Sequence, residues 1–111
     1  MKLPNHENAV ISQEKLQHYL LSKTHPIGRF KASIFEELGY RQREWAKLQT
    51  DLKRFLEYEA DEKEKTAYGQ KYEIRGSLLG PSGKSIYLVT AWIVLNAEDF
   101  PRFITAYPGE R

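Results

Sequence analysis

Residues 85–95 read SIYLVTAWIVL, and this stretch decides the fold class. It is apolar at nearly every position and rich in β-branched and aromatic residues, which is typical of a strand covered on both faces. Residues 71–78, KYEIRGSL, alternate polar and apolar side chains and predict a half-buried neighbouring strand. The turn-forming sequence GPSG at 80–83 joins the two, and residues 102–107 predict a third strand. The sequence therefore predicts a three-stranded antiparallel meander within residues 70–109.

The half of the chain before this meander has the period of helices. We expect three helices, over about 12–23, 26 or 28–38, and 42–58. Ser12 would cap the first, and Gly39 would end the second in a left-handed conformation. Residues 1–11 are expected to be an N-terminal arm and residues 59–69 a charged loop. The prediction is one domain with an α+β fold, in which three N-terminal helices pack on one face of a three-stranded antiparallel sheet.

Composition narrows the possible settings of the protein. The 111 residues include no cysteine, which excludes disulfides and a thiolate nucleophile. Residues 1–11 lack the apolar run of a signal peptide, and no stretch approaches the ~20 apolar residues that span a bilayer. We therefore expect a cytoplasmic protein with no membrane partner. The net charge of +2 is too small to indicate a polyanionic partner by itself.

The register between the predicted strands decides which side chains share a face. A two-residue or four-residue hairpin loop would place odd positions of the first strand beside even positions of the second. The open face would then carry Lys71, Glu73, Arg75, Leu88, Thr90 and Trp92. The face toward the helices would carry Tyr72, Ile74, Leu78, Tyr87, Val89, Ala91 and Ile93. Their partners on the helices would be Phe30, Ile34, Trp45, Leu48 and Leu52.

The third strand would turn one of two sets of side chains to the open face: Phe103, Thr105 and Tyr107, or Arg102, Ile104 and Ala106. Ile104 and Ala106 are interpreted as core residues, which would place Thr105 and Tyr107 on the open face beside Thr90 and Trp92. A β-bulge would change this assignment, because it shifts the register of a strand.

His25 stands at the entrance of the second predicted helix. An imidazole is a natural general acid or base near neutral pH, and Arg29 and Lys31 follow it as cations for an anion. The alternative is an ordinary exposed histidine in a helix-entry loop. No metal site is expected, because His6, His18 and His25 lack the spacing of metal ligands.

The polar residues of the open face suit the metal-free cleavage of a phosphodiester by a 2′-hydroxyl. That reaction needs a base, an acid and cations near the phosphate. Glu73 or His25 would be the base, and Tyr107 would donate a proton or a hydrogen bond. The cations for the phosphate and the aromatic ring for base stacking would be Lys71, Arg75 and Trp92. The alternative is cross-strand pairing of charges and aromatic rings on a solvated sheet.

Several stretches together resemble a bacterial domain family of unknown function, over about Leu3 to Gly109. They are HPIGRFKA at 25–32, YGQKY at 68–72, GPSG at 80–83, VTAWI at 89–93 and PRFITAYP at 101–108. That family occurs as small free-standing proteins and as C-terminal modules of larger bacterial or phage-related proteins. Its order of helices and then sheet is similar to the ribonuclease toxins that include barnase, EndoU and RelE-like proteins.

The resemblance also implies a site. Its residues would be His25, Lys31, Lys71, Thr105 and Tyr107, with Thr90 and Arg102 as further candidates. The chain departs from a two-histidine mechanism, because no second histidine lies on a predicted strand near His25.

The function expected from the sequence is a metal-independent, cofactor-free ribonuclease-like domain of a bacterial toxin-type system, with RNA as its partner. Its catalytic residues would be His25, Thr105 and Tyr107. Its substrate-binding residues would be Lys31, Lys71, Arg75, Thr90, Trp92 and Arg102. Two alternatives stay open: a non-catalytic domain that binds a cognate partner protein, and an accessory domain without a site.

Overall fold

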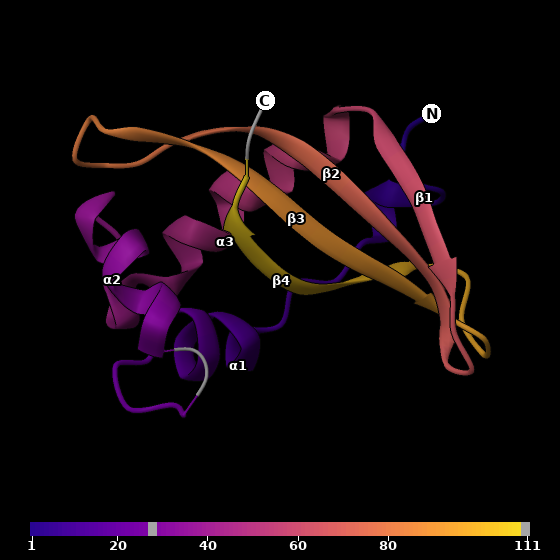
Figure 1. Ribbon diagram of the computed structural model, residues 1–111, viewed down its shortest axis with the longest axis horizontal. Helices are drawn as coiled ribbons and strands as arrows, with labels where there is room; N and C mark the ends of the chain where they lie inside the picture. The colour runs from indigo at the N-terminus through magenta and orange to yellow at the C-terminus, as the bar shows by residue number, and fades with distance from the viewer. Residues whose placement is uncertain (27–28, 110–111) are drawn as a thin grey trace.

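The computed structural model describes residues 1–26 and 29–109 and has an α+β fold (Figure 1). The helical segments are η1 (His6–Asn8), α1 (Gln13–Lys15), η2 (Leu16–Leu20), α2 (Arg29–Glu37), η3 (Gln42–Glu44), α3 (Trp45–Lys53) and η4 (Arg54–Glu57). The strands are β1 (Ala60–Lys65), β2 (Gly69–Leu79), β3 (Ser85–Leu95) and β4 (Pro101–Pro108). No helix in these two ranges is long and apolar enough to cross a membrane.

The sheet has four antiparallel strands in the order β1-β2-β3-β4, so the prediction of three strands is wrong. The additional strand, β1, occupies most of the predicted charged loop at 59–69. Its sequence ADEKEK lacks alternating apolar residues, because five of its six side chains are exposed. An edge strand of this kind is held by backbone pairing, and charges on both faces discourage further strand addition. Hydrophobic periodicity therefore gave no signal for it.

The helical part is also more divided than the predicted three helices. Ser12 does cap the first segment, since its Oγ accepts from the backbone N–H of Lys15 at 3.1 Å. After one α-helical turn, however, the chain widens into the π-helix η2, where the N–H of Leu21 donates to the carbonyl of Leu16 at 2.9 Å. The start of the second predicted helix at Gly28 lies outside the described residues. The helices are therefore short segments dispersed among 3₁₀ and π turns rather than three continuous rods.

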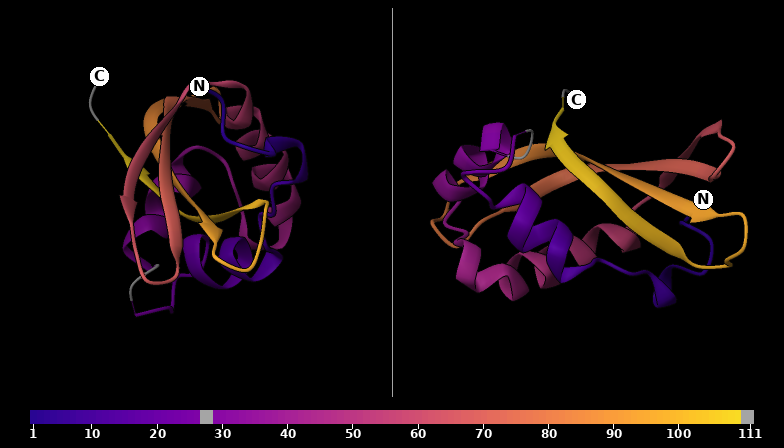
Figure 2. Two further views of the ribbon diagram at one scale, coloured as in Figure 1. Left: turned by 90° about the vertical axis from the view of Figure 1, so that its right-hand side faces the viewer. Right: turned by 90° about the horizontal axis from the view of Figure 1, so that it is seen from below.

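The core lies between one face of the sheet and the helical segments (Figure 2). The helical residues in it include Leu16, Leu20, Leu48, Leu52 and Phe55, all close to fully buried. The strand residues that meet them are Tyr72, Ile74, Leu78, Leu88, Thr90, Trp92, Phe103 and Ala106. Trp92 and Thr90 are each 0% exposed, so the predicted register between the first two strands of the meander is wrong.

The physical reason for the wrong register is the length of the hairpin loop. Leu79 pairs with Ser85, which leaves a loop of odd length, 80–84, in place of the even loops assumed from the turn sequence. A shift of one residue sends every side chain of a strand to the other face. Gly83 has a positive φ of 89°, which suits a residue without Cβ. The loop also closes the end of α2, because the N–H of Ser82 donates to the carbonyl of Leu38 at 2.9 Å.

β4 contains a β-bulge that decides the direction of its side chains. Thr105 pairs with Ala91, but the next pair along is Phe103 with Trp92, so Ile104 is an extra residue. The bulge lets Phe103 enter the core while Thr105 and Tyr107 turn to the opposite face. They therefore lie beside Ala91 and Val89, and the predicted neighbours Thr90 and Trp92 point away from them.

The first eleven residues are attached to the sheet and to α3. The N–H of Val10 donates to the carbonyl of Pro101, and the N–H of Phe103 donates to the carbonyl of Val10, each at 2.9 Å. At the other sheet edge, the N–H of Ala60 donates to the carbonyl of Met1 at 2.7 Å. Leu3 and Ile11 are buried in the core, so the segment predicted as an N-terminal arm is anchored to the core by these two side chains.

Candidate functional site

A shallow groove crosses the sheet face that points away from the core. Its lining comes from all four strands and consists of Lys63, Glu64, Lys71, Tyr72, Glu73, Ala91, Ile104 and Thr105. Its volume is about 150 Å³. We call it the outward groove. Register places Glu73, Ala91 and Thr105 in one row across β2, β3 and β4. With neighbouring strands about 4.8 Å apart, the backbones at the two ends of this row are separated by about 10 Å.

Glu73 is the hydrogen-bonding centre at one end of the row. Its Oε2 accepts from the hydroxyl of Tyr107, and its Oε1 accepts from Nη2 of Arg75, each at 3.1 Å. Nζ of Lys63 lies 3.8 Å from Oε1. Burial raises the pKa of Tyr107, and the hydrogen bond to Glu73 and its negative charge raise it further, against a smaller opposing effect of Arg75. Tyr107 is therefore held in its protonated form, as a donor.

Lys31 of α2 reaches the other end of the row around the β4 edge of the sheet. Its Nζ donates to Oγ1 of Thr105 at 2.8 Å and to the hydroxyl oxygen of Tyr19 at 3.1 Å. Burial raises the pKa of Tyr19, but hydrogen bonds from Lys31 and Thr105 and the charges of Lys31 and Lys15 outweigh it, so that this pKa falls below its usual value. Lys31 thus joins the helical part to the outward face of the sheet.

His25 adjoins this group through Tyr19. The two rings meet edge to face with their centroids 5.0 Å apart. The loop that carries His25 is held by Ser22, whose Oγ accepts from the backbone N–H of His25 at 3.1 Å. Tyr19 and His25 also border an open hollow of about 380 Å³, whose other lining residues are Ser12, Glu14, Lys15 and His18. A continuous series of side-chain contacts therefore runs from His25 through Tyr19 and Lys31 to Thr105, at the outward groove.

The structure thus places several predicted site residues together. Lys31 contacts Thr105 directly, Tyr107 and Arg75 contact Glu73, and Lys71 lines the same groove as Thr105. Lys71 also lies 3.7 Å from the carboxylate of Glu64.

Three predicted residues lie elsewhere or are engaged. Thr90 and Trp92 are buried on the core face, where Nε1 of Trp92 donates to Oγ1 of Thr90 at 2.8 Å and that hydroxyl donates to the carbonyl of Ile74 at 2.9 Å. Neither can touch a ligand in the outward groove, so their placement on the open face is wrong. Arg102 makes two hydrogen bonds of 2.7 Å to the carboxylate of Glu98 and stacks over Phe100. Its guanidinium is therefore committed to a local ion pair.

Two residues of the assembled site were missed from the sequence. Tyr19 has helical spacing with Leu16 and Leu20, which predicts a place on the apolar face of a helix. Only the fold reveals that its hydroxyl meets Lys31. Lys63 falls in the charged loop predicted at 59–69, and no pattern in residues 60–65 signals a strand. Glu73 was recognised as a possible base, because its open-face position follows from strand alternation alone.

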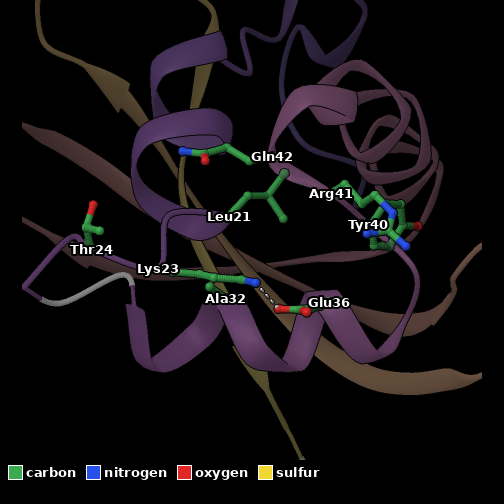
Figure 3. A pocket seen from close by; sticks show the side chains of 8 residues that line it. All are labelled: Leu21, Lys23, Thr24, Ala32, Glu36, Tyr40, Arg41 and Gln42. Atoms are coloured by element: carbon green, nitrogen blue, oxygen red, sulfur yellow. Dashed lines mark ion pairs between the residues drawn. The ribbon is translucent and has the colours of Figure 1, made fainter.

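A second hollow, of about 240 Å³, lies between α2 and the segment after η2 (Figure 3). Lys23 and Glu36 form an ion pair across it, with Nζ and Oε2 3.0 Å apart. Tyr40 borders it and donates a 2.5 Å hydrogen bond to the buried carboxylate of Asp51. None of the predicted site residues is among the described residues that line it.

The outward groove and the contacts that lead to it bring positive charge, a carboxylate and hydroxyl groups onto one surface. Lysine and arginine side chains supply positive charge, Glu73 supplies a proton acceptor, and hydroxyls supply donors. The acceptor and the Lys31–Thr105 pair lie at opposite ends of one row across the sheet. A group bound between them would have an acid or base on each side.

The architecture defines a small α+β domain with helical segments packed on one face of a four-stranded antiparallel sheet. Residues 2–110 match the family described as "Domain of unknown function (DUF6883)", and the chain belongs to that family. No curated protein matches it.

One solved structure with the same fold is a chain from a "Contact-dependent growth inhibition toxin - immunity protein complex from Klebsiella pneumoniae 342". The TM-score is 0.72 over 96% of this chain and 98% of that one, with 21% sequence identity. At this identity the similarity establishes a shared fold.

Proposed function

We propose that this chain is a metal-independent ribonuclease domain of a bacterial toxin–immunity system. The observation that carries the proposal is the row Glu73–Ala91–Thr105 with Lys31 at its end, which puts a carboxylate and a hydrogen-bonded ammonium–hydroxyl pair on one open surface. The shared fold with a chain of a toxin–immunity complex supports the biological setting.

The proposed reaction is a transesterification, in which the phosphorus atom exchanges its bond to the 5′ oxygen for a bond to the neighbouring 2′ oxygen. Glu73 takes the proton of the 2′-hydroxyl, the O2′–P bond forms, and the P–O5′ bond breaks. A proton donor at the other side of the phosphate protonates O5′, which leaves as a hydroxyl. The products are a 2′,3′-cyclic phosphate and a 5′-hydroxyl end. Each proton-transfer group contributes about 10²–10⁴-fold to a reaction of this type.

Each of the other residues has a place in this scheme. Lys31 and Thr105 bind the non-bridging oxygens of the reacting phosphate, where charge grows in the transition state. Tyr107 stays protonated and adds a hydrogen bond from the Glu73 side. Lys71, Lys63 and Arg75 guide the neighbouring phosphates along the outward groove. The proton donor for O5′ comes from the pair of rings, His25 and Tyr19, that adjoins Lys31.

The test is incubation of the purified chain with total RNA in the presence of EDTA, followed by mapping of the new ends. We expect cleavage that leaves cyclic phosphate and 5′-hydroxyl ends. Lys31→Ala should reduce the rate at least 100-fold. The matched control is Lys84→Ala, which removes an exposed lysine from the hairpin loop and should leave the rate unchanged. Absence of cleavage by the wild-type chain would reject the ribonuclease assignment.

The alternative function is a domain that binds a cognate protein without catalysis. The feature that favours it is the source of the structural neighbour, which comes from a two-protein complex. A pull-down from the native host, followed by the same substitutions on the outward groove, separates the two functions. A catalytically silent chain that captures one partner, and loses it on Lys31→Ala, would favour this alternative.

A further inference from the structure

Two tyrosines flank the proposed phosphate position, and the charged groups beside them have opposite signs. Tyr107 donates to a carboxylate at the Glu73 end. Tyr19 accepts from an ammonium group at the Thr105 end. A phenol that donates to a carboxylate is disfavoured as an acid, because its loss of a proton would leave two negative charges in contact. A phenol beside an ammonium group forms its anion more easily.

Tyr19 is held in a more positive environment than that single bond describes. Nζ of Lys31 and Nζ of Lys15 each lie 5.3 Å from the centre of its ring, on top of the 3.1 Å hydrogen bond from Lys31 to its hydroxyl oxygen. The same lysine binds Thr105 at 2.8 Å. Because Lys31 bonds both hydroxyls, a phosphate oxygen that contacts Lys31 and Thr105 lies close to the Tyr19 hydroxyl.

We infer that Tyr19 is a catalytic residue that gives its phenolic proton to the leaving 5′ oxygen, an inference that rests on the ribonuclease activity proposed above. His25 packs edge-on against the Tyr19 ring and is a positioning residue, because Tyr19 lies between it and Lys31. The sequence pattern alone favours His25 and Tyr107 for this role.

The proton and electron balance of the step is simple. Glu73 removes the proton of the 2′-hydroxyl, and the electron pair of that O–H bond forms the O2′–P bond. The electron pair of the P–O5′ bond goes to O5′, which takes the proton of Tyr19. The phenolate that remains is compensated by Lys31, and water restores the proton. The lowered pKa of Tyr19 and the raised pKa of Tyr107 agree with this division of roles.

The experiment compares two substrates that differ only in their need for an acid. Uridylyl-3′,5′-adenosine has a poor leaving group that must be protonated, whereas uridine 3′-(4-nitrophenyl phosphate) has a leaving group that departs as its anion. The variants are Tyr19→Phe, Tyr107→Phe and, as the matched control, Tyr68→Phe, which alters a 76% exposed ring in the β1–β2 turn. Circular dichroism and a thermal melt confirm that each variant is folded.

We expect Tyr19→Phe to slow cleavage of the dinucleotide by about 100-fold or more and that of the nitrophenyl ester by less than about 10-fold. Tyr107→Phe should slow both substrates by a similar factor, and Tyr68→Phe neither. Equal losses on both substrates, or no loss, for Tyr19→Phe would overturn the inference and leave the ribonuclease assignment intact. A wild-type chain that cleaves neither substrate would reject the ribonuclease and this inference together.

Should Tyr19→Phe fail to fold, Lys31→Met gives an independent answer on the same pair of substrates. It removes the cation that compensates the phenolate, so the dinucleotide should again lose more rate than the nitrophenyl ester. Equal loss on both would mean that Lys31 acts on the phosphate alone, which would overturn the role given to Tyr19.

Discussion

Replacement of Thr90 by valine should destabilise the fold and leave the chemistry intact. The Thr90 hydroxyl lies in the core, where it accepts from Nε1 of Trp92 at 2.8 Å and donates to the carbonyl of Ile74 at 2.9 Å. Valine has nearly the same shape but cannot accept, so the indole N–H would be buried without a partner. Such a group costs about 1–3 kcal/mol. We take about 2 kcal/mol as the expected loss in the free energy of unfolding.

That loss converts into a shift that a thermal melt resolves. At about 2.1 cal/mol/K per residue, a chain of this length loses about 4 °C of melting temperature per kcal/mol, or about 9 °C in all. Thr90→Ser keeps the hydroxyl and should recover more than half of it. Thr105→Val is the mirror experiment at the outward groove: it should cost little stability and most of the RNA cleavage. A Thr90→Val chain that melts within 2 °C of wild type but cleaves RNA far more slowly would refute the placement of Thr90 in the core.

Two further predictions concern backbone geometry and pH. A Cβ at Gly80 would overlap the carbonyl oxygen of Leu38, so Gly80→Ala should lower the melting temperature by more than 10 °C, whereas Gly83→Ala meets no neighbouring atom and should cost only the roughly 1 kcal/mol of its positive φ. The rate of dinucleotide cleavage should fall as the pH rises through the pKa of Tyr19, since the acid must be protonated, and that fall should be centred below the ordinary tyrosine value of 10.0. The fall should be absent from Tyr19→Phe, and its persistence in that variant would contradict the role given to Tyr19.

The chain order of the elements could be predicted from the sequence, but the number and register of the strands could not. Residues 85–95 predict a central strand because their composition suits burial on both faces, and β3 has these bounds. β1 has nothing to bury, so periodicity is silent about it. The register depended on whether the loop at 80–84 holds an even or odd number of residues, which GPSG does not decide. The assignment of Thr90 and Trp92 to the open face failed for this reason alone.

The candidate site could be predicted in its parts better than in its connections. Lys31 and Thr105 were both proposed from the family resemblance, yet no spacing rule says that they touch, because 74 residues separate them. No sequence pattern predicts the β-bulge at Ile104 either, although this bulge turns Thr105 and Tyr107 outward. The helical spacing of Tyr19 with Leu16 and Leu20 predicts a core residue and gives no indication of its contact with Lys31.

The attachment of Val10 to β4 bears on the order in which the protein is assembled during synthesis. Val10 exchanges backbone hydrogen bonds with residues 101 and 103, so residues 1–11 can be fixed in place only after β4 has left the ribosome. Until then Leu3 and Ile11 have no completed core to enter. Contacts between such distant residues close slowly. We therefore expect the nascent chain to expose these apolar side chains to chaperones until the sheet of this domain has been synthesised.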